Sequence, residues 1–242
     1  MKKVLFILII TCAVVGLSNA QSRAYTVKGG LTTGFQKWGN VDQDPLFSYH
    51  GAVLMESVPE GDAFGLFAQL GYHVKGSAWR NAVFSNPTNG GVSIFTRKFK
   101  FQNIALVAGI KKDFADRGNY KLYYLFGIRG DYTVSTNLKD YEAENEFLGG
   151  PVYPFDEAVR RVNYGVTAGA GLEFPFTDYI GGILEFTISP DFSDQYRQGA
   201  FSAVVYQNGS PQTRNFSERK IRNTVLELSL GFRFLHKIEY ID

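Results

Sequence analysis

The chain has 242 residues, with 25 Lys and Arg against 23 Asp and Glu, and 15% of it is aromatic, mostly as 21 Phe and 14 Tyr. Two of the lysines lie in the first twenty residues and no acid does, so the rest of the chain carries no net formal charge. This balance argues against a basic nucleic-acid-binding surface. Aromatic residues together with 26 Gly indicate strands and turns more than helices.

Residues 1–20 have the form of a secretory signal peptide. A positively charged start precedes an uncharged run over residues 4–17, and Ser18 and Ala20 put small residues at −3 and −1 of a cleavage site. The run is shorter than the roughly 20 apolar residues of a spanning helix, which disfavours the alternative of a retained anchor. Cys12, the only cysteine, lies inside this run without a lipoprotein signal around it. The mature chain is therefore expected to lack disulfides and thiolate zinc sites.

The rest of the chain is a series of segments in which apolar and polar residues alternate. In the first, the odd positions from Tyr25 to Phe35 are mostly large and apolar, whereas the even positions from Ala24 to Gly34 are small or polar. A period of two is typical of strands whose two faces meet different surroundings. The pattern returns in seven further segments, at 47–56, 64–77, 103–111, 120–135, 162–174, 180–189 and 223–234.

The connections between these eight segments alternate in length. Three are tight turns, at 59–62, 115–119 and 175–178, and four are long, at 37–46, 79–98, 137–160 and 190–218. Short turns on one side and long loops on the other are typical of a bacterial outer-membrane barrel, with the turns in the periplasm. The sequence therefore predicts an all-β fold: an eight-stranded antiparallel transmembrane up-and-down β-barrel over residues 21–235, with a filled polar lumen. Residues 236–242 are expected to form a short periplasmic tail.

Aromatic residues near the segment ends support a membrane-embedded barrel, because such residues form girdles at both membrane interfaces. The alternative is a soluble sandwich or lipocalin-like barrel, in which the apolar face would form the core. The expected turn-side girdle comprises Tyr25, Phe64, Phe114, Tyr120, Phe174, Phe232 and Phe234, and the loop-side girdle Trp38, Phe47 and Trp79.

Charged residues of both signs fall on the face that would line the lumen. Buried charges must pair or carry a desolvation cost of several kcal/mol, so we expect a lumen closed by salt bridges, a plug rather than a pore. The predicted lumen charge network comprises Glu56, His73, Lys75, Lys111, Arg129, Asp131, Glu173, Glu185, Glu227 and Arg233.

His50 and His73 lie on adjacent predicted strands and both face inward, near Ser48, Ser77 and Glu56. A Ser/His/Glu hydrolase and a metal site are both conceivable with these residue types. A barrel enzyme that acts on lipid needs side chains directed at the bilayer, whereas these point into the lumen. The favoured interpretation is an interior hydrogen-bond network, with no catalytic, cofactor-binding or metal-binding residues.

The glycine-rich segment from Gly165 to Phe174 and the last segment, ending in Gly231-Phe-Arg-Phe234, resemble the PorT-like outer-membrane β-barrel family of Bacteroidota. The likeness covers the whole mature chain. Several members of that family serve the type IX secretion and gliding machinery. The resemblance therefore implies a scaffolding role in protein secretion from the outer membrane, although many members have no assigned role.

Apolar residues in the long loops point to protein partners, because side chains of this kind need burial in a cap or against another protein. The candidates are Tyr153, Phe155, Phe201 and Tyr206. The leading hypothesis is a non-enzymatic structural or interaction component of an outer-membrane assembly, embedded in the lipid bilayer and docked through its external loops or C-terminal tail. The alternatives are a small-solute channel and, less favoured, a lipid-modifying barrel enzyme.

Overall fold

The computed structural model describes residues 22–39, 42–59, 63–85, 92–116, 118–147, 152–207 and 210–237. The expected signal peptide and the last five residues of the expected C-terminal tail lie outside the described residues. Within the described ranges, no helix has the length and apolar character needed to cross a membrane.

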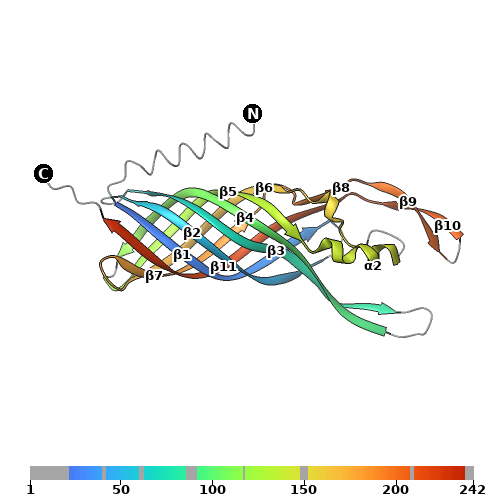
Figure 1. The fold of residues 1–242 in the computed structure, drawn as a ribbon, viewed down its shortest axis with the longest axis horizontal. Helices are drawn as coiled ribbons and strands as arrows, with labels where there is room; N and C mark the ends of the chain where they lie inside the picture. The colour runs from blue at the N-terminus through green and yellow to red at the C-terminus, as the bar shows by residue number, and fades with distance from the viewer. Residues whose placement is uncertain are drawn as a thin grey trace, which may run out of the picture.

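Eight strands form a closed antiparallel ring, which confirms the predicted fold class (Figure 1). Neighbours in sequence are neighbours in the ring from β1 to β7, and β11 closes it by pairing with both β7 and β1. The ring strands are β1 (Ser22–Trp38), β2 (Asp44–Val58), β3 (Gly65–Ser85), β4 (Val92–Asp116), β5 (Lys121–Thr136), β6 (Val162–Pro175), β7 (Ile180–Pro190) and β11 (Arg219–Lys237).

The closing ladder between β1 and β11 is continuous, from Ser22 opposite Lys237 to Trp38 opposite Ile221. A closed ring leaves no unpaired strand edge, which satisfies the backbone within lipid. β11 extends two residues beyond the predicted barrel end at 235 because His236 and Lys237 still find partners in β1. The short turns, the start of β1 and the end of β11 lie at the left of Figure 1, and the long connections lie at the right.

The two faces of each strand have opposite character, with polar residues inside and large apolar residues outside. On β1, Thr26 and Thr32 are buried, whereas Val27 and Leu31 are 55% and 67% exposed. The same inversion holds around the ring, where exposed residues include Tyr49, Val53, Leu70, Ile104, Phe126, Ile128, Tyr164, Phe186, Leu228 and Leu230. A contiguous exposed apolar band is what a lipid-facing surface requires and what water disfavours. It rules out the soluble barrel or sandwich.

The long connections contain more regular structure than the sequence predicts. Much of the expected loop 79–98 is strand, because β3 and β4 run past the barrel rim and pair with each other through Ser85 and Val92. The expected loops 190–218 and 137–160 contain short elements. They are β8 (Tyr196–Gln198), β9 (Phe201–Gln207) and β10 (Ser210–Phe216), and the helical turns η1 (Leu138–Tyr141), α2 (Glu142–Phe147) and η2 (Asp156–Ala158).

η1, β8 and the connection around η2 pack with the outer ends of β1, β4 and β11 as a cap over the loop-side mouth of the barrel. Its buried core comprises Trp38, Phe99, Phe101, Leu138, Tyr141, Tyr153, Val159, Tyr196 and Ile221. The assignment of Trp38 to a lipid-facing girdle is therefore wrong. Trp38 is 7% exposed and its ring lies 5.0 Å from that of Phe99, because its position on β1 has the parity of the inward-facing residues.

Candidate functional site

The lumen is crossed by ion pairs arranged in successive layers. In the layer nearest the short turns, Glu56 of β2 accepts hydrogen bonds from Lys111 Nζ at 2.8 Å and Arg233 Nε at 2.6 Å. Arg233 also donates to Glu173 Oε1 at 2.8 Å, and Lys111 lies 4.0 Å from the same carboxylate. Two cations and two carboxylates from four strands therefore neutralise each other in a part of the barrel largely closed to water.

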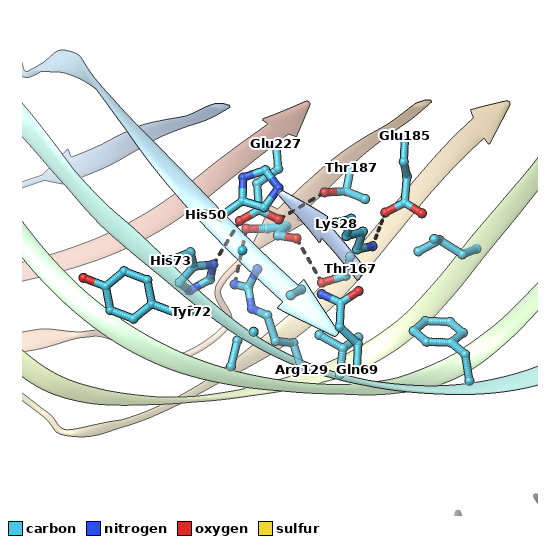
Figure 2. Close-up of a pocket in the computed structure, with 18 residues that line it drawn as sticks. Lys28, His50, Gln69, Tyr72, His73, Arg129, Thr167, Glu185, Thr187 and Glu227 are labelled. Carbon is cyan, nitrogen blue, oxygen red and sulfur yellow. Dashed lines mark hydrogen bonds and ion pairs between the residues drawn. The ribbon is translucent and has the colours of Figure 1, made fainter. Parts of the chain in front are cut away.

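The next layer is built around Glu185 of β7. Its carboxylate pairs with Lys28 of β1 and accepts a hydrogen bond at 2.8 Å from the hydroxyl of Tyr123 on β5. Gly171 of β6 makes room for the tyrosine, because a Cβ at that position would collide with the Tyr123 ring. Figure 2 shows Lys28 and Glu185 pointing toward each other inside the lumen, from the two strands that flank β11.

His50 lies in the middle of the lumen and bonds to hydroxyl groups. Its Nδ1 is 3.0 Å from Thr32 Oγ1 and its Nε2 is 2.8 Å from Ser229 Oγ. The two hydroxyls come from β1 and β11, the strands that close the ring. The imidazole therefore links three neighbouring strands through neutral partners.

His73 pairs directly with His50 across the β2–β3 ladder, but its ring contacts carboxylates (Figure 2). Its Nδ1 is 3.1 Å from Glu227 Oε1, and its Nε2 is 3.2 Å from Asp131 Oδ1. The second contact is close enough for ion pairing but lacks hydrogen-bond geometry, since neither atom has a hydrogen-bond partner among the described residues. His73 therefore lies between two acidic groups on opposite sides of the lumen.

The densest layer lies toward the cap and joins Lys75, Arg129, Asp131 and Asp191. Lys75 Nζ is 2.7 Å from Asp131 and 2.8 Å from Asp191, and all three side chains are fully buried. Arg129 donates to the same two carboxylates, through Nε to Asp131 at 3.0 Å and through its NH2 group to Asp191. Two cations thus share two carboxylates, an arrangement that offsets the desolvation of all four groups.

Each of the ten predicted lumen residues lies in the lumen within 4.0 Å of an oppositely charged group, counting the two His73 contacts as ion pairs. Two further lumen charges, Lys28 and Asp191, are absent from the predicted network. Lys28 falls on the polar face of the first segment, so parity alone places it inside. Asp191 lies just beyond the predicted segment 180–189, although the alternation continues past its end, with Ser189 and Asp191 buried and Phe192 exposed.

The contacts of the two histidines differ from those of a hydrolase triad. A catalytic imidazole of that kind bonds both to a nucleophilic hydroxyl and to an orienting carboxylate. Here these partners are divided, since Ser229 bonds to His50 whereas Asp131 and Glu227 contact His73.

The other residues considered with the histidines have partners elsewhere. Ser77 donates a hydrogen bond to Gln36 at 2.7 Å, and Glu56 belongs to the layer nearest the short turns. The His50 ring bonds to Thr32 and Ser229, and the His73 ring contacts Asp131 and Glu227, instead of the expected neighbours Ser48, Ser77 and Glu56. Within the described chain, no group of three or more His, Cys, Asp or Glu residues is placed to hold a metal ion.

Little free space remains between these layers. A cavity of about 20 Å³ in the middle of the lumen is lined by His50, His73, Glu185 and Glu227, among others (Figure 2). One water needs roughly 10–15 Å³ measured in this way, so the cavity has room for one or two waters. The aromatic core of the cap lies beyond it on the loop side.

The four loop residues expected to face a partner have different positions. Tyr153 is 2% exposed and belongs to the cap core, so its assignment to a partner surface is wrong. The Asn145 side chain donates a hydrogen bond to the Tyr153 carbonyl and accepts one from the Tyr153 N–H, and these two bonds hold Tyr153 in the cap. Phe155 is half-buried, Phe201 is exposed and stacks on Phe216 with ring centroids 5.1 Å apart, and the side chain of Tyr206 lies outside the described residues.

A family model agrees with this architecture. A family model described as an outer membrane protein β-barrel domain matches residues 19–193, more than half of the chain. A comparison with curated proteins finds no match.

Among solved structures, Neisserial surface protein A is similar at 14% identity, over 87% of this chain and 97% of that one, with a TM-score of 0.43. A major outer membrane protein from Thermus thermophilus is also 14% identical, over 88% and 99% of the two chains, with a TM-score of 0.43. The N-terminal β-barrel domain of Pseudomonas aeruginosa OprF is 10% identical, over 89% and 98%, with a TM-score of 0.42.

Proposed function

The chain belongs to the outer membrane protein β-barrel domain family and lies in the bacterial outer membrane, and from this premise we propose that it is a non-conducting, non-catalytic anchor. The barrel holds a rigid external cap and two projecting ribbons, and a partner protein binds to the ribbons. One ribbon is β9–β10, and the other is the part of β3 and β4 that runs past the barrel rim, which we call the β3–β4 ribbon. The single observation that carries the proposal is a lumen closed by ion pairs beneath an aromatic cap.

The ion-pair layers support a lumen that does not conduct. Lys75 and its two aspartate partners have no solvent-exposed side-chain surface. An ion crossing this layer would have to separate cations from carboxylates in a region with little water, which costs several kcal/mol for each charge. The same layers support a scaffold in preference to an enzyme, because the lumen histidines His50 and His73 are buried and held by internal partners.

The ribbons support a protein-binding role. β9 and β10 pair only with each other among the described strands and extend beyond the cap (Figure 1). An isolated two-stranded ribbon is marginally stable in water, and its unpaired edges can accept another strand. Val204 on β9 is 59% exposed and Ile94 on the β3–β4 ribbon is 70% exposed. Exposed apolar side chains on two ribbons are suited to a partner that covers both.

The resemblance to PorT-like barrels favours the type IX secretion machinery as the assembly in which this partner is found. We propose this assignment on the sequence likeness. It is tested by identifying the proteins that co-purify with the tagged chain from detergent-solubilised outer membranes of its native host, by mass spectrometry. Recovery of secretion components supports the assignment, and recovery of an unrelated assembly would replace it.

Conductance tests the anchor proposal directly. Purified barrel reconstituted into a planar lipid bilayer is expected to give no stable open steps. The double variant Lys75→Ser/Arg129→Ser is the positive comparison, because it removes both cations from the densest layer and leaves two carboxylates that attract water and ions. Stable open steps from the unmodified barrel would establish a small-solute channel and overturn the proposal.

Deletion of the β9–β10 ribbon tests whether this ribbon binds the partner. Phe201 and Phe216 are paired neighbours, so a short Gly-Ser turn can replace residues 201–216 without opening the cap. We expect the deletion to keep the heat-dependent mobility shift of a folded barrel and to lose co-purifying protein. Phe201→Ser/Val204→Ser should do the same, whereas the matched control Gln212→Ser/Thr213→Ser should retain the partner. If the deleted form still co-purified with the partner protein, the β9–β10 ribbon would not be its binding site.

A further inference from the structure

The outer surface of the barrel carries two like-charged pairs at its loop-side rim. Lys37 of β1 lies directly opposite Arg222 of β11 in the closing ladder. Both side chains point outward and are exposed, because their neighbours Trp38 and Ile221 point inward and are buried. Like charges directly opposite each other on one face of an antiparallel pair are destabilising. The pairing therefore needs a compensating anion.

A second like-charged pair lies beside the first, where Lys220 of β11 is opposite Arg197 of β8. Glu218 partly compensates it, with carboxylate oxygens 2.9 Å from Arg197 Nε and 2.8 Å from Lys220 Nζ. These four cations, which we call the rim cluster, are Lys37, Arg197, Lys220 and Arg222.

Compensation within the protein is incomplete at Lys37. Arg222 has a carboxylate partner in Asp194 at 3.0 Å. Within the described ranges, no carboxylate lies within ion-pair distance of Lys37. Four cations and two carboxylates leave an excess of two positive charges in the rim cluster.

The height of the rim cluster matches a membrane interface. Twelve residues along β1 and β11 separate the Lys37–Arg222 pair from the Tyr25–Phe234 pair of the turn-side girdle. At about 3.3 Å per residue and a tilt of about 40°, this separation is about 30 Å along the membrane normal. The apolar band of such barrels is about 25 Å tall. Lys37 and Arg222 therefore lie just beyond the band, and Leu31 and Leu228, paired within it, face the acyl chains below.

We propose that the rim cluster binds the phosphate groups of a phosphorylated glycolipid in the outer leaflet, such as lipid A. A phosphate between Lys37 and Arg222 would bridge the two cations and remove their repulsion, and the guanidinium fork matches phosphate oxygens. We favour a lipid over soluble phosphate because the rim cluster adjoins the exposed apolar surface of β1 and β11, where the acyl chains of a lipid would lie. A soluble phosphate ion would make no contact with this apolar surface.

Native mass spectrometry of the detergent-solubilised full chain titrated with diphosphoryl lipid A tests this site. Each basic residue at an anionic lipid surface contributes about a fivefold gain in affinity. Lys37→Gln/Arg222→Gln is therefore expected to bind lipid A about 30-fold more weakly. The matched control is Lys98→Gln/Lys100→Gln, which removes two exposed, outward-facing cations from β4 at the same end of the barrel.

Two outcomes would overturn the proposal. Equal weakening by the test and control variants would show diffuse attraction without a site. Displacement of lipid A by millimolar inorganic phosphate would assign the cluster to a soluble anion. Either result would contradict the lipid site alone. The proposal that the ribbons bind a partner would stand, because no residue of the rim cluster belongs to β9 or β10. The heat-dependent mobility shift of each variant verifies that it is folded.

Discussion

Arg233 of β11 reaches past β1 to Glu56 of β2, with Nε and Oε1 2.6 Å apart. Since β1 pairs with β11 on one side and β2 on the other, this contact ties together the three strands at which the ring closes. Arg233 also binds Glu173 of β6, which lies two strands from β11 on its other side, past β7. Arg233 therefore links the strands on both sides of β11, including those at the seam of the ring.

Glu56→Gln should strongly destabilise the barrel. The change leaves Arg233 and Lys111 sharing Glu173 as their one remaining carboxylate partner in this layer, and loss of one member of a buried pair typically costs about 3–5 kcal/mol. Urea-induced unfolding in lipid vesicles, followed by tryptophan fluorescence, measures the difference. Asp116→Asn is the control, because Asp116 and Lys121 are exposed and 3.7 Å apart, and such pairs contribute about 1 kcal/mol at most. Equal effects of the two changes would contradict a structural role for the layer.

Gly171→Ala should impair folding by displacing Tyr123. A Cβ at residue 171 would clash with the phenol ring, so the hydrogen bond to Glu185 would be lost and Glu185 would retain only Lys28. The expected loss of stability is about 1–3 kcal/mol. Gly130→Ala is the matched control, because a Cβ there meets nothing within 4 Å. If Gly171→Ala unfolds at the same urea concentration as Gly130→Ala, the lumen has more room than these contacts imply.

Asn145→Ala should loosen the cap and leave the barrel closed. The Asn145 side chain accepts a hydrogen bond from the Tyr153 N–H at 2.8 Å and donates to the Tyr153 carbonyl at 3.1 Å. Both backbone groups would lose their partner in a buried position, at about 1–3 kcal/mol each. Limited proteolysis should then cleave within 137–160 while the barrel keeps its heat-dependent mobility shift. Glu142→Gln, on the exposed side of α2, should leave the cleavage rate unchanged.

Strand parity accounts for most of what the sequence reveals about the fold and the lumen. Lys75, Arg129 and Asp131 follow from alternation along single strands, and their convergence follows from closure of the ring. Pairings across the lumen are not encoded locally, so the sequence cannot assign Lys28 to Glu185 over 157 positions of separation. Composition also misleads where parity is ignored, and Trp38 is the example.

The cap is the part least accessible to sequence reasoning. Its short elements have no regular period, and Tyr153 and Tyr196 are buried by contacts between loops distant in the chain. The sequence misplaces Tyr153 at a partner surface because an isolated apolar loop residue looks the same whether it packs on a partner or on its own cap. Its hydrogen bonds with Asn145 become visible only once the two residues are folded together.

The cap should open at alkaline pH through Tyr196. Burial raises the pKa of the Tyr196 hydroxyl above its ordinary value, and this effect outweighs the hydrogen bond from the Phe155 N–H and the nearby charge of Arg219. In the unfolded chain the hydroxyl ionises near pH 10, so its stabilising contribution is complete below about pH 10 and is lost as the pH rises through the higher folded pKa. Trp38 fluorescence and tyrosinate absorbance should therefore change together above about pH 10.

Tyr196→Phe separates this effect from general alkaline unfolding. The variant keeps the buried ring and loses the ionisable group, together with the 2.7 Å hydrogen bond to Gln198. We expect a cap slightly less stable at neutral pH, whose Trp38 fluorescence no longer follows tyrosine ionisation in the same pH range. An unchanged fluorescence transition in Tyr196→Phe would assign the alkaline opening to another group. The barrel should stay folded in both proteins, because Tyr196 lies in the cap rather than in the ring of ladders that closes through β1 and β11.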